Sequence, residues 1–138
     1  MKIEVSIDIA APPEVVWPIM IDVERWPEWT ASVSKVERLE KTAFGLGASA
    51  RIQQPKLMTM IWHVSEFQPG RFFVWQTRSP GVVTSGSHIV RPNGSGSVVT
   101  LSVEQKGWLA PIVGPLVAGL TRRYVEIEAQ GLKKRCEE

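Results

Sequence analysis

The chain has 138 residues and a formal net charge of +2, with 16 lysines and arginines scattered among 14 acidic residues. This length predicts a single domain over residues 1–138 with a sizeable buried core. The absence of a basic stripe argues against a nucleic-acid partner. The only cysteine, Cys136, excludes an internal disulfide and a cysteine metal cluster.

The N-terminal residues and the longest uncharged run indicate where in the cell the protein is expected. Residues Met1–Glu4 lack the apolar core of a signal peptide, which predicts a cytoplasmic protein. Residues 107–121 are too few to span a bilayer and contain Pro111 and Pro115, so we expect no stable membrane insertion. The same run has two open interpretations: membrane contact while a ligand enters, or a buried helix. Its helical spacing of apolar residues favours the buried helix.

The first elements follow from alternation and from prolines. Residues 3–9 alternate isoleucine or valine with polar residues, which predicts a strand with one wet face. The proline pair at 12–13 opens a short helix, which Pro18 should bend or shorten. Asp22 is the expected cap of a second short helix. It leads to the Trp-Pro-Glu-Trp stretch at 26–29, which suits a rigid flap that closes one end of a sheet.

Six further strands are expected before the C-terminal helix. Their predicted bounds are Val33–Glu40, Ala48–Gln54, Thr59–Phe67, Phe72–Arg78, Val82–Arg91 and Ser97–Lys106. Turn signals rich in glycine and proline separate the last four of them. The close spacing predicts an antiparallel meander rather than parallel strands joined by helices.

The last predicted element is a helix from Ala110 to about Arg135. Its apolar residues recur every three to five positions, which indicates one helical face. That predicted face consists of Ile112, Leu116, Leu120, Tyr124, Ile127 and Leu132. Pro115 is expected to delay or kink the start of the helix.

A wide curved sheet and one narrow helix leave a gap, and the two-residue period of a strand predicts which side chains face it. The large ones are Met60, Trp62, Phe73, Trp75 and Tyr124, either as plugs or as walls of a pocket. The polar ones are His88, Tyr124, Thr77, Thr84 and Gln105. An apolar cavity with few polar groups is typical of small-molecule sites.

The chain resembles the START-like, or SRPBCC, superfamily, and most closely its polyketide cyclase/dehydrase and lipid-transport group. The matching features are Pro13-x-x-Val16-Trp17, Asp22-x-x-x-Trp26-Pro27-Glu28-Trp29, Gly45-x-Gly47, Trp62-x-Val64-x-Glu66-Phe67-x-Pro69, Phe73-x-Trp75, His88 and Gly107. The resemblance implies an α+β helix-grip fold, in which a curved antiparallel seven-stranded sheet wraps around a long C-terminal helix. Two short helices follow the first strand in that fold.

The resemblance also implies a pocket between the sheet and the C-terminal helix. A lipid, polyketide or other small hydrophobic ligand would bind there, and the protein would act as a carrier or sensor. The expected ligand-binding residues are Met60, Trp62, Phe73, Trp75, His88, Leu101, Leu116, Leu120 and Tyr124. The alternative is a polyketide cyclase or aromatase that uses the same cavity, because fold alone does not fix function.

The sequence offers only one candidate catalytic residue. His88 is the candidate acid or base, with Tyr124 as its expected partner, and the competing interpretation is a strand histidine satisfied by a neighbour. We expect no metal, because two histidines without nearby carboxylates do not make a typical zinc site. The Gly-x-Gly-x-x-Ala match at 45–50 precedes a strand rather than a helix, so no nucleotide cofactor is expected. A homodimer is left open.

Overall fold

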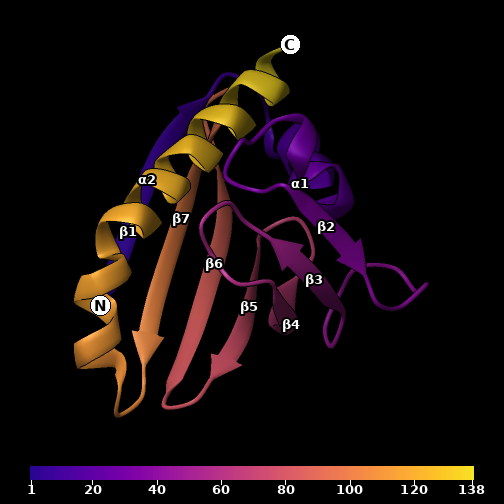
Figure 1. The fold of residues 1–138 in the computed structure, drawn as a ribbon. Helices are drawn as coiled ribbons and strands as arrows, with labels where there is room; N and C mark the ends of the chain where they lie inside the picture. Colours follow the sequence, from indigo (N-terminus) through magenta and orange to yellow (C-terminus); the bar gives the residue numbers. More distant parts are fainter.

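A seven-stranded antiparallel sheet curves around a long helix in the computed structural model, which describes residues 1–138 (Figure 1). The strands are β1 (Lys2–Ile9), β2 (Lys35–Arg38), β3 (Ser49–Gln53), β4 (Met60–Gln68), β5 (Phe72–Ser79), β6 (Val82–Asn93) and β7 (Gly96–Lys106). Their order across the sheet is β1-β7-β6-β5-β4-β3-β2, so the first strand pairs with the last. The predicted antiparallel meander is confirmed, although β2 is shorter than the predicted Val33–Glu40.

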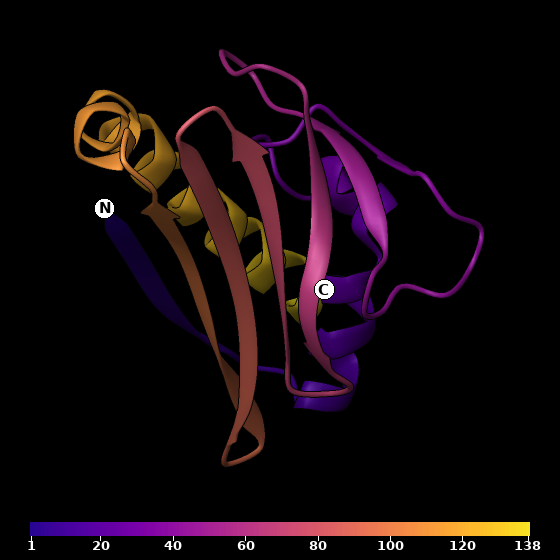
Figure 2. The ribbon, with the colours of Figure 1, turned by 90° about the horizontal axis from the view of Figure 1, so that it is seen from below.

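The helices lie on one side of the sheet. They are α1 (Pro13–Ile21), the 3₁₀ helix η1 (Val23–Glu28) and α2 (Ala110–Glu137). Figure 1 shows α2 running obliquely over the sheet, with α1 beside its C-terminal end, and Figure 2 shows α1 and the C-terminal half of α2 behind the strands. The elements in contact with α2 include β1, β7 and α1. This arrangement confirms the predicted α+β helix-grip fold.

A bulge in β4 adjusts which side chains reach the concave side of the sheet. The pairing of β4 with β5 shifts between Val64 and Glu66, which adds one residue to β4. After the shift Phe67 pairs with Phe73, and its ring lies 5.6 Å from that of Trp17 on α1. The bulge therefore brings Phe67 into the core under α1.

The Trp-Pro-Glu-Trp stretch closes the sheet at the α1 end. Trp26 is buried, and its Nε1 donates to the backbone carbonyl of Met20 at 3.0 Å. Pro27 lacks an N–H, which fits a short 3₁₀ turn rather than a longer α-helix. Asp22 precedes η1 but makes no side-chain cap, which corrects that prediction. Its carboxylate instead lies 3.4 Å from the Arg25 guanidinium.

The C-terminal half of α2 is fastened to the end of β1. Lys133 Nζ donates to the Asp8 carbonyl and to Glu137 Oε2, each at 2.7 Å, and the Ala10 N–H donates to the same carboxylate at 2.8 Å. The hydrogen bond from Lys133, followed by that from Ala10, holds the pKa of Glu137 below its usual value. These contacts fix where α2 ends against the sheet.

The apolar face predicted for the first half of α2 is wrong. Leu116 is 81% exposed and Ile112 is 63% exposed, and Leu120 is only half-buried. Val113 and Val117 face the sheet instead. The first half of α2 is apolar on all sides, so hydrophobic spacing could not identify the inward face.

Cys136 is buried near the end of α2, which predicts an unreactive thiol. Burial, followed by the nearby Glu137 charge, raises its pKa from 9.0 to about 11. A thiol reacts as its thiolate, so about a hundredfold smaller fraction is reactive at pH 8 in the folded chain than in the unfolded chain. Ellman's reagent should therefore label the native protein slowly and the protein in guanidinium rapidly. Equal rates in the two conditions would contradict the buried position.

Candidate functional site: an apolar cavity under α2

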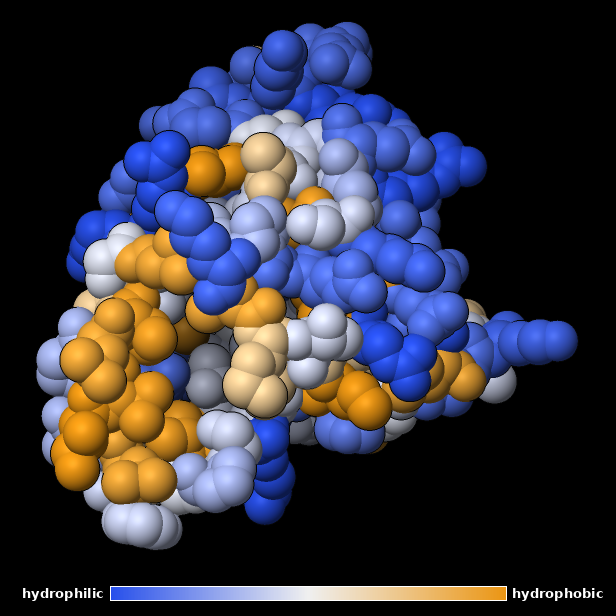
Figure 3. Space-filling model, in the orientation of Figure 1, coloured by the Kyte–Doolittle hydropathy of each residue, from blue (hydrophilic) through white to orange (hydrophobic).

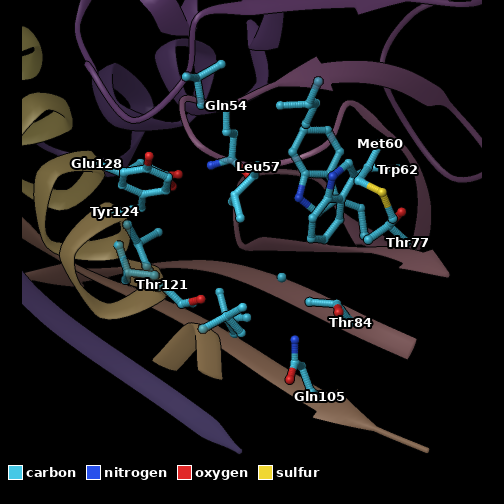
Figure 4. Close-up of a pocket in the computed structure, with 18 of the residues that line it drawn as sticks. Gln54, Leu57, Met60, Trp62, Thr77, Thr84, Gln105, Thr121, Tyr124 and Glu128 are labelled. Carbon is cyan, nitrogen blue, oxygen red and sulfur yellow. The ribbon is translucent and has the colours of Figure 1, made fainter. Parts of the chain in front are cut away.

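A cavity of about 340 Å³ lies between the concave face of the sheet and the first half of α2. Five strands, β3 to β7, contribute to its lining, and α2 and the β3–β4 loop cover it. Figure 4 shows Thr84 and Gln105 on the sheet, with Tyr124 and Glu128 reaching in from α2. Most of the lining is hydrophobic, and the volume lies within the range of small-molecule pockets.

Packed aromatic rings close the cavity at the η1 end. Trp26 lies 5.3 Å from Trp75 and 5.2 Å from His88, measured between ring centroids. Phe73 stacks on the His88 ring at 4.4 Å with an interplanar angle of 6°, on the side away from the cavity. Phe73 therefore fills the core behind the cavity, whereas Trp62 and Trp75 line the cavity wall. The sequence had left open which of these side chains would fill the gap and which would line it.

The floor of the cavity is open because β6 carries small side chains there. A Cβ on Gly86 would lie 3.2 Å from Trp75 Cδ1 and Nε1, and 3.5 Å from the ring of Trp62. Any larger side chain at this position must push against the two indole rings. Glycine therefore allows both rings to lie over the middle of the sheet.

The main polar feature is a pair formed by His88 on β6 and Glu128 on α2. His88 Nε2 lies 3.1 Å from Glu128 Oε2, and the two side chains are 7% and 16% exposed. The predicted pairing of His88 with Tyr124 is wrong, because the carboxylate one helical turn further on occupies that position. His88 Nδ1 is buried and has no hydrogen-bond partner.

Tyr124 helps to hold together the segments that cover the cavity. Its hydroxyl donates to the backbone carbonyl of Pro55 in the β3–β4 loop, which joins α2 to that loop. The phenol ring still lines the cavity, but the hydroxyl proton is already engaged. This hydrogen bond ties together the two segments that cover the cavity, α2 and the β3–β4 loop.

Other polar groups lie toward the opposite end of the floor. Thr77 Oγ1 donates to the Ile61 carbonyl at 2.8 Å and is satisfied, but Gln105 Oε1 is buried without a partner. Thr84 lines the cavity four residues before His88 on the same strand. At about 3.3 Å per residue, roughly 13 Å separates these two polar positions.

The mouth of the cavity lies beside the β3–β4 loop. Leu57 and Met58 line it and are 38% and 81% exposed. Figure 3 shows hydrophobic side chains around a hollow in this face of the molecule, most of them at the lower left over the first half of α2. A ligand that leaves the cavity would therefore pass between apolar side chains.

Six of the nine predicted site residues line the cavity: Met60, Trp62, Trp75, His88, Leu101 and Tyr124. The other three do not, since Phe73 lies behind the aromatic wall and Leu116 and Leu120 lie on the outer side of α2. Sequence reasoning missed Val113, Val117, Thr121 and Glu128, which recur at helical spacing with Tyr124. Spacing from Tyr124 alone does not identify this face, because Leu116 and Leu120 lie at helical spacing from Tyr124 as well.

Two further structural findings concern metals and membranes. No group of three or more histidine, cysteine, aspartate or glutamate side chains lies close enough together to hold a metal ion. None of the helices combines the length and the hydrophobicity needed to cross a bilayer.

Comparisons with known proteins give one family. The family model described as polyketide cyclase / dehydrase and lipid transport matches residues 1–137. No curated protein matches the chain in sequence.

Solved structures share the fold at low sequence identity. A START superfamily protein from Mycobacterium smegmatis aligns with a TM-score of 0.80 and 17% identity, covering 99% of this chain and 97% of that one. The Zhui aromatase/cyclase from Streptomyces sp. R1128 gives 0.75 and 18%, covering 99% and 93%. A protein from Thermus thermophilus gives 0.78 and 20%, covering 99% and 97%.

Proposed function

Because the chain belongs to the polyketide cyclase/dehydrase and lipid-transport family, we propose that it binds a small hydrophobic ligand in the cavity under α2. It would act as a carrier or sensor. The observation that carries the proposal is a cavity of about 340 Å³ between the sheet and α2, walled mainly by apolar side chains. The ligand-contacting residues would be the six predicted ones that line it, together with Val113, Val117 and Glu128.

The lining of the cavity also suggests the chemical character of the ligand. Apolar burial contributes about 25 cal/mol per Å², so about 200 Å² of buried ligand surface contributes roughly 5 kcal/mol before the cost of association. Gln105, whose Oε1 has no hydrogen-bond partner in the protein, is suited to hydrogen-bond a polar group of the ligand. We therefore expect a mainly apolar molecule with a hydroxyl, carbonyl or amide group toward one end.

Native mass spectrometry tests the proposal. The purified protein would be incubated with a lipid extract of its producing cells, desalted and measured, and bound compounds would be identified after denaturation. Saturable binding of 1-anilinonaphthalene-8-sulfonate, displaced by the recovered compound, would locate the ligand in the same cavity. Recovery of no apolar compound, together with no saturable probe binding, would contradict the proposal.

The alternative is a cyclase that acts on a polyketide in the same cavity. The observation that favours it is the histidine–carboxylate pair, a combination able to move a proton. The geometry favours the carrier, because Glu128 occupies His88 Nε2 and Nδ1 is buried. Neither ring nitrogen is therefore free to reach a ligand.

Glu128→Gln distinguishes the two functions. A carrier should keep its probe affinity within a few-fold, because the amide can still hydrogen-bond His88. A cyclase that relies on this carboxylate should lose about 10²-fold in turnover of a poly-β-ketone substrate. His88→Asn is the companion variant, and turnover of such a substrate by the unmodified protein would itself favour the cyclase.

Three predictions from the sequence remain part of this proposal. They are residence in the cytoplasm, the absence of a nucleic-acid partner, and a homodimer as an open assembly state. Cell fractionation, a DNA and RNA mobility-shift assay, and analytical ultracentrifugation check them in turn.

A further inference from the structure

The outer face of α2, together with Trp108 just before the helix, changes character halfway along its length. Between positions 108 and 121 every exposed residue is apolar or glycine: Trp108, Pro111, Ile112, Pro115, Leu116 and Gly119. From position 122 to the C-terminus every exposed residue is polar or charged. Helix faces in water normally carry polar residues, as the second half of α2 does. We call the six apolar positions the outer apolar face.

The outer apolar face continues into the mouth of the cavity. Met58, 81% exposed, and Leu57 line the mouth across from α2, and Figure 3 shows hydrophobic residues grouped around the hollow. Trp108 is 78% exposed, and the backbone beside it is fixed because Leu109 donates its N–H to the Gly81 carbonyl at 3.0 Å. A contiguous exposed apolar surface of this kind marks an interaction site rather than ordinary solvated surface.

The charged residues within and beside this surface are mainly basic. Residues 105–125, which contain the outer apolar face, include no acidic residue. Residues 41–65, which contain the β3–β4 loop, include none either. The first of these segments carries Lys106, Arg122 and Arg123, and Lys56 adjoins Leu57. The nearest preceding acidic residue on β7, Glu104, is already 3.5 Å from Lys106. The partner should therefore be apolar in its interior and negative at its surface.

We propose that the outer apolar face docks the protein on an anionic lipid bilayer, with the cavity mouth turned toward the membrane. Exposed tryptophan and aliphatic side chains enter the interfacial region, and the basic residues contact anionic headgroups. A second copy of the chain fits less well, because a symmetric contact through this face brings the same basic residues of both copies together. Docking goes beyond ligand binding and does not depend on it.

Vesicle sedimentation tests the docking. The wild-type chain should pellet with mixed phosphatidylglycerol–phosphatidylcholine vesicles and much less with pure phosphatidylcholine vesicles. Leu116→Glu should lower the partition coefficient by about tenfold or more, because it replaces a buried aliphatic contact with a charge. Leu46→Glu is the matched control, since Leu46 is 73% exposed but lies in the β2–β3 loop, and it should bind like the wild type.

Three further measurements separate the effect of charge from an effect on folding. Raising the salt from about 0.1 to 1 M should weaken binding to the anionic vesicles, since screening removes the attraction of Arg122 and Arg123. Replacing both arginines with glutamine should lower the preference for anionic vesicles by roughly 5- to 25-fold. Unchanged thermal unfolding of Leu116→Glu would show that the variant is folded.

Three outcomes would overturn the proposal. They are no sedimentation of the wild type with either vesicle, equal sedimentation of Leu116→Glu and Leu46→Glu, and a concentration-dependent dimer that Leu116→Glu abolishes. The last outcome would assign the face to a second copy of the chain. Probe binding in the cavity is measured separately, so a failure of docking leaves the ligand proposal standing.

Discussion

Gly131→Ala is expected to lower the free energy of unfolding by about 3 kcal/mol, although alanine is the better helix former. A Cβ at position 131 of α2 would lie 1.9 Å from the Trp29 carbonyl oxygen and 3.0 Å from its carbonyl carbon. Backbone atoms cannot rotate away as a flexible side chain can. Either α2 or the Trp-Pro-Glu-Trp flap must therefore move, and both are packed against the core.

The matched control is Gly119→Ala in the same helix. A Cβ there meets nothing within 4 Å, so the substitution should stabilise the protein by about 0.5–1 kcal/mol through lower unfolded-chain entropy. Thermal or denaturant unfolding measures both variants, and Gly131→Ala should melt roughly 10 °C lower than the wild type. The prediction fails if the two substitutions change stability in the same direction.

The close approach at Gly131 shows what the flap does. Trp29 touches α2 through its backbone, and Glu28 lies 2.7 Å from Arg135 on the same helix. Trp26, from the same turn, forms the inner wall of the cavity. One rigid turn therefore sets the height of α2 above the sheet and closes the cavity at that end.

The strands and their inward faces could be predicted from the sequence because period-two patterns are local. In β7, apolar residues from Val99 to Val103 alternate with polar ones, so Leu101 has only one consistent face. β6 was ambiguous, since both of its faces carry apolar residues. His88 was nevertheless placed inside, and it is 6% exposed.

The inward face of α2 could not be predicted in the same way. A helical pattern identifies a buried face only where the opposite face is polar, and the first half of α2 has no polar face. Leu116 is larger and more hydrophobic than Val117 or Thr121. Spacing and side-chain size therefore both favoured the face that is exposed in the structure. From the sequence, apolar residues such as Leu116 are expected to be buried, and only the folded structure shows that they are exposed.

Glu128 was missed for a related reason. In the sequence it stands among basic residues near the end of α2, where a charged residue reads as part of a solvated face. In the structure it is four residues after Tyr124, on the side that meets β6, and His88 supplies its partner at 3.1 Å. Only the register between α2 and β6 brings these two groups together, and no local pattern encodes that register.

Thr84→Trp is expected to weaken binding of any cavity ligand by about 50- to 100-fold. Thr84 lies on the floor between Thr77 and Gln105, its partners on β5 and β7, and its side chain faces the cavity (Figure 4). An indole ring, with about 200 Å² of surface, would take up space that the ligand needs. Loss of about 100 Å² of apolar contact costs the ligand about 2.5 kcal/mol.

Ser85→Trp is the matched control, because the neighbouring residue of a strand points to the opposite face of the sheet. Ser85 accepts a hydrogen bond from Gln76 Nε2 at 3.1 Å and does not line the cavity. This variant should bind 1-anilinonaphthalene-8-sulfonate, and any compound recovered with the protein, as the wild type does. Titration by fluorescence gives the affinities, and thermal unfolding shows that both variants are folded. Equal affinities for the two variants would place the binding site outside the cavity, since the only difference between them is which face of β6 carries the ring.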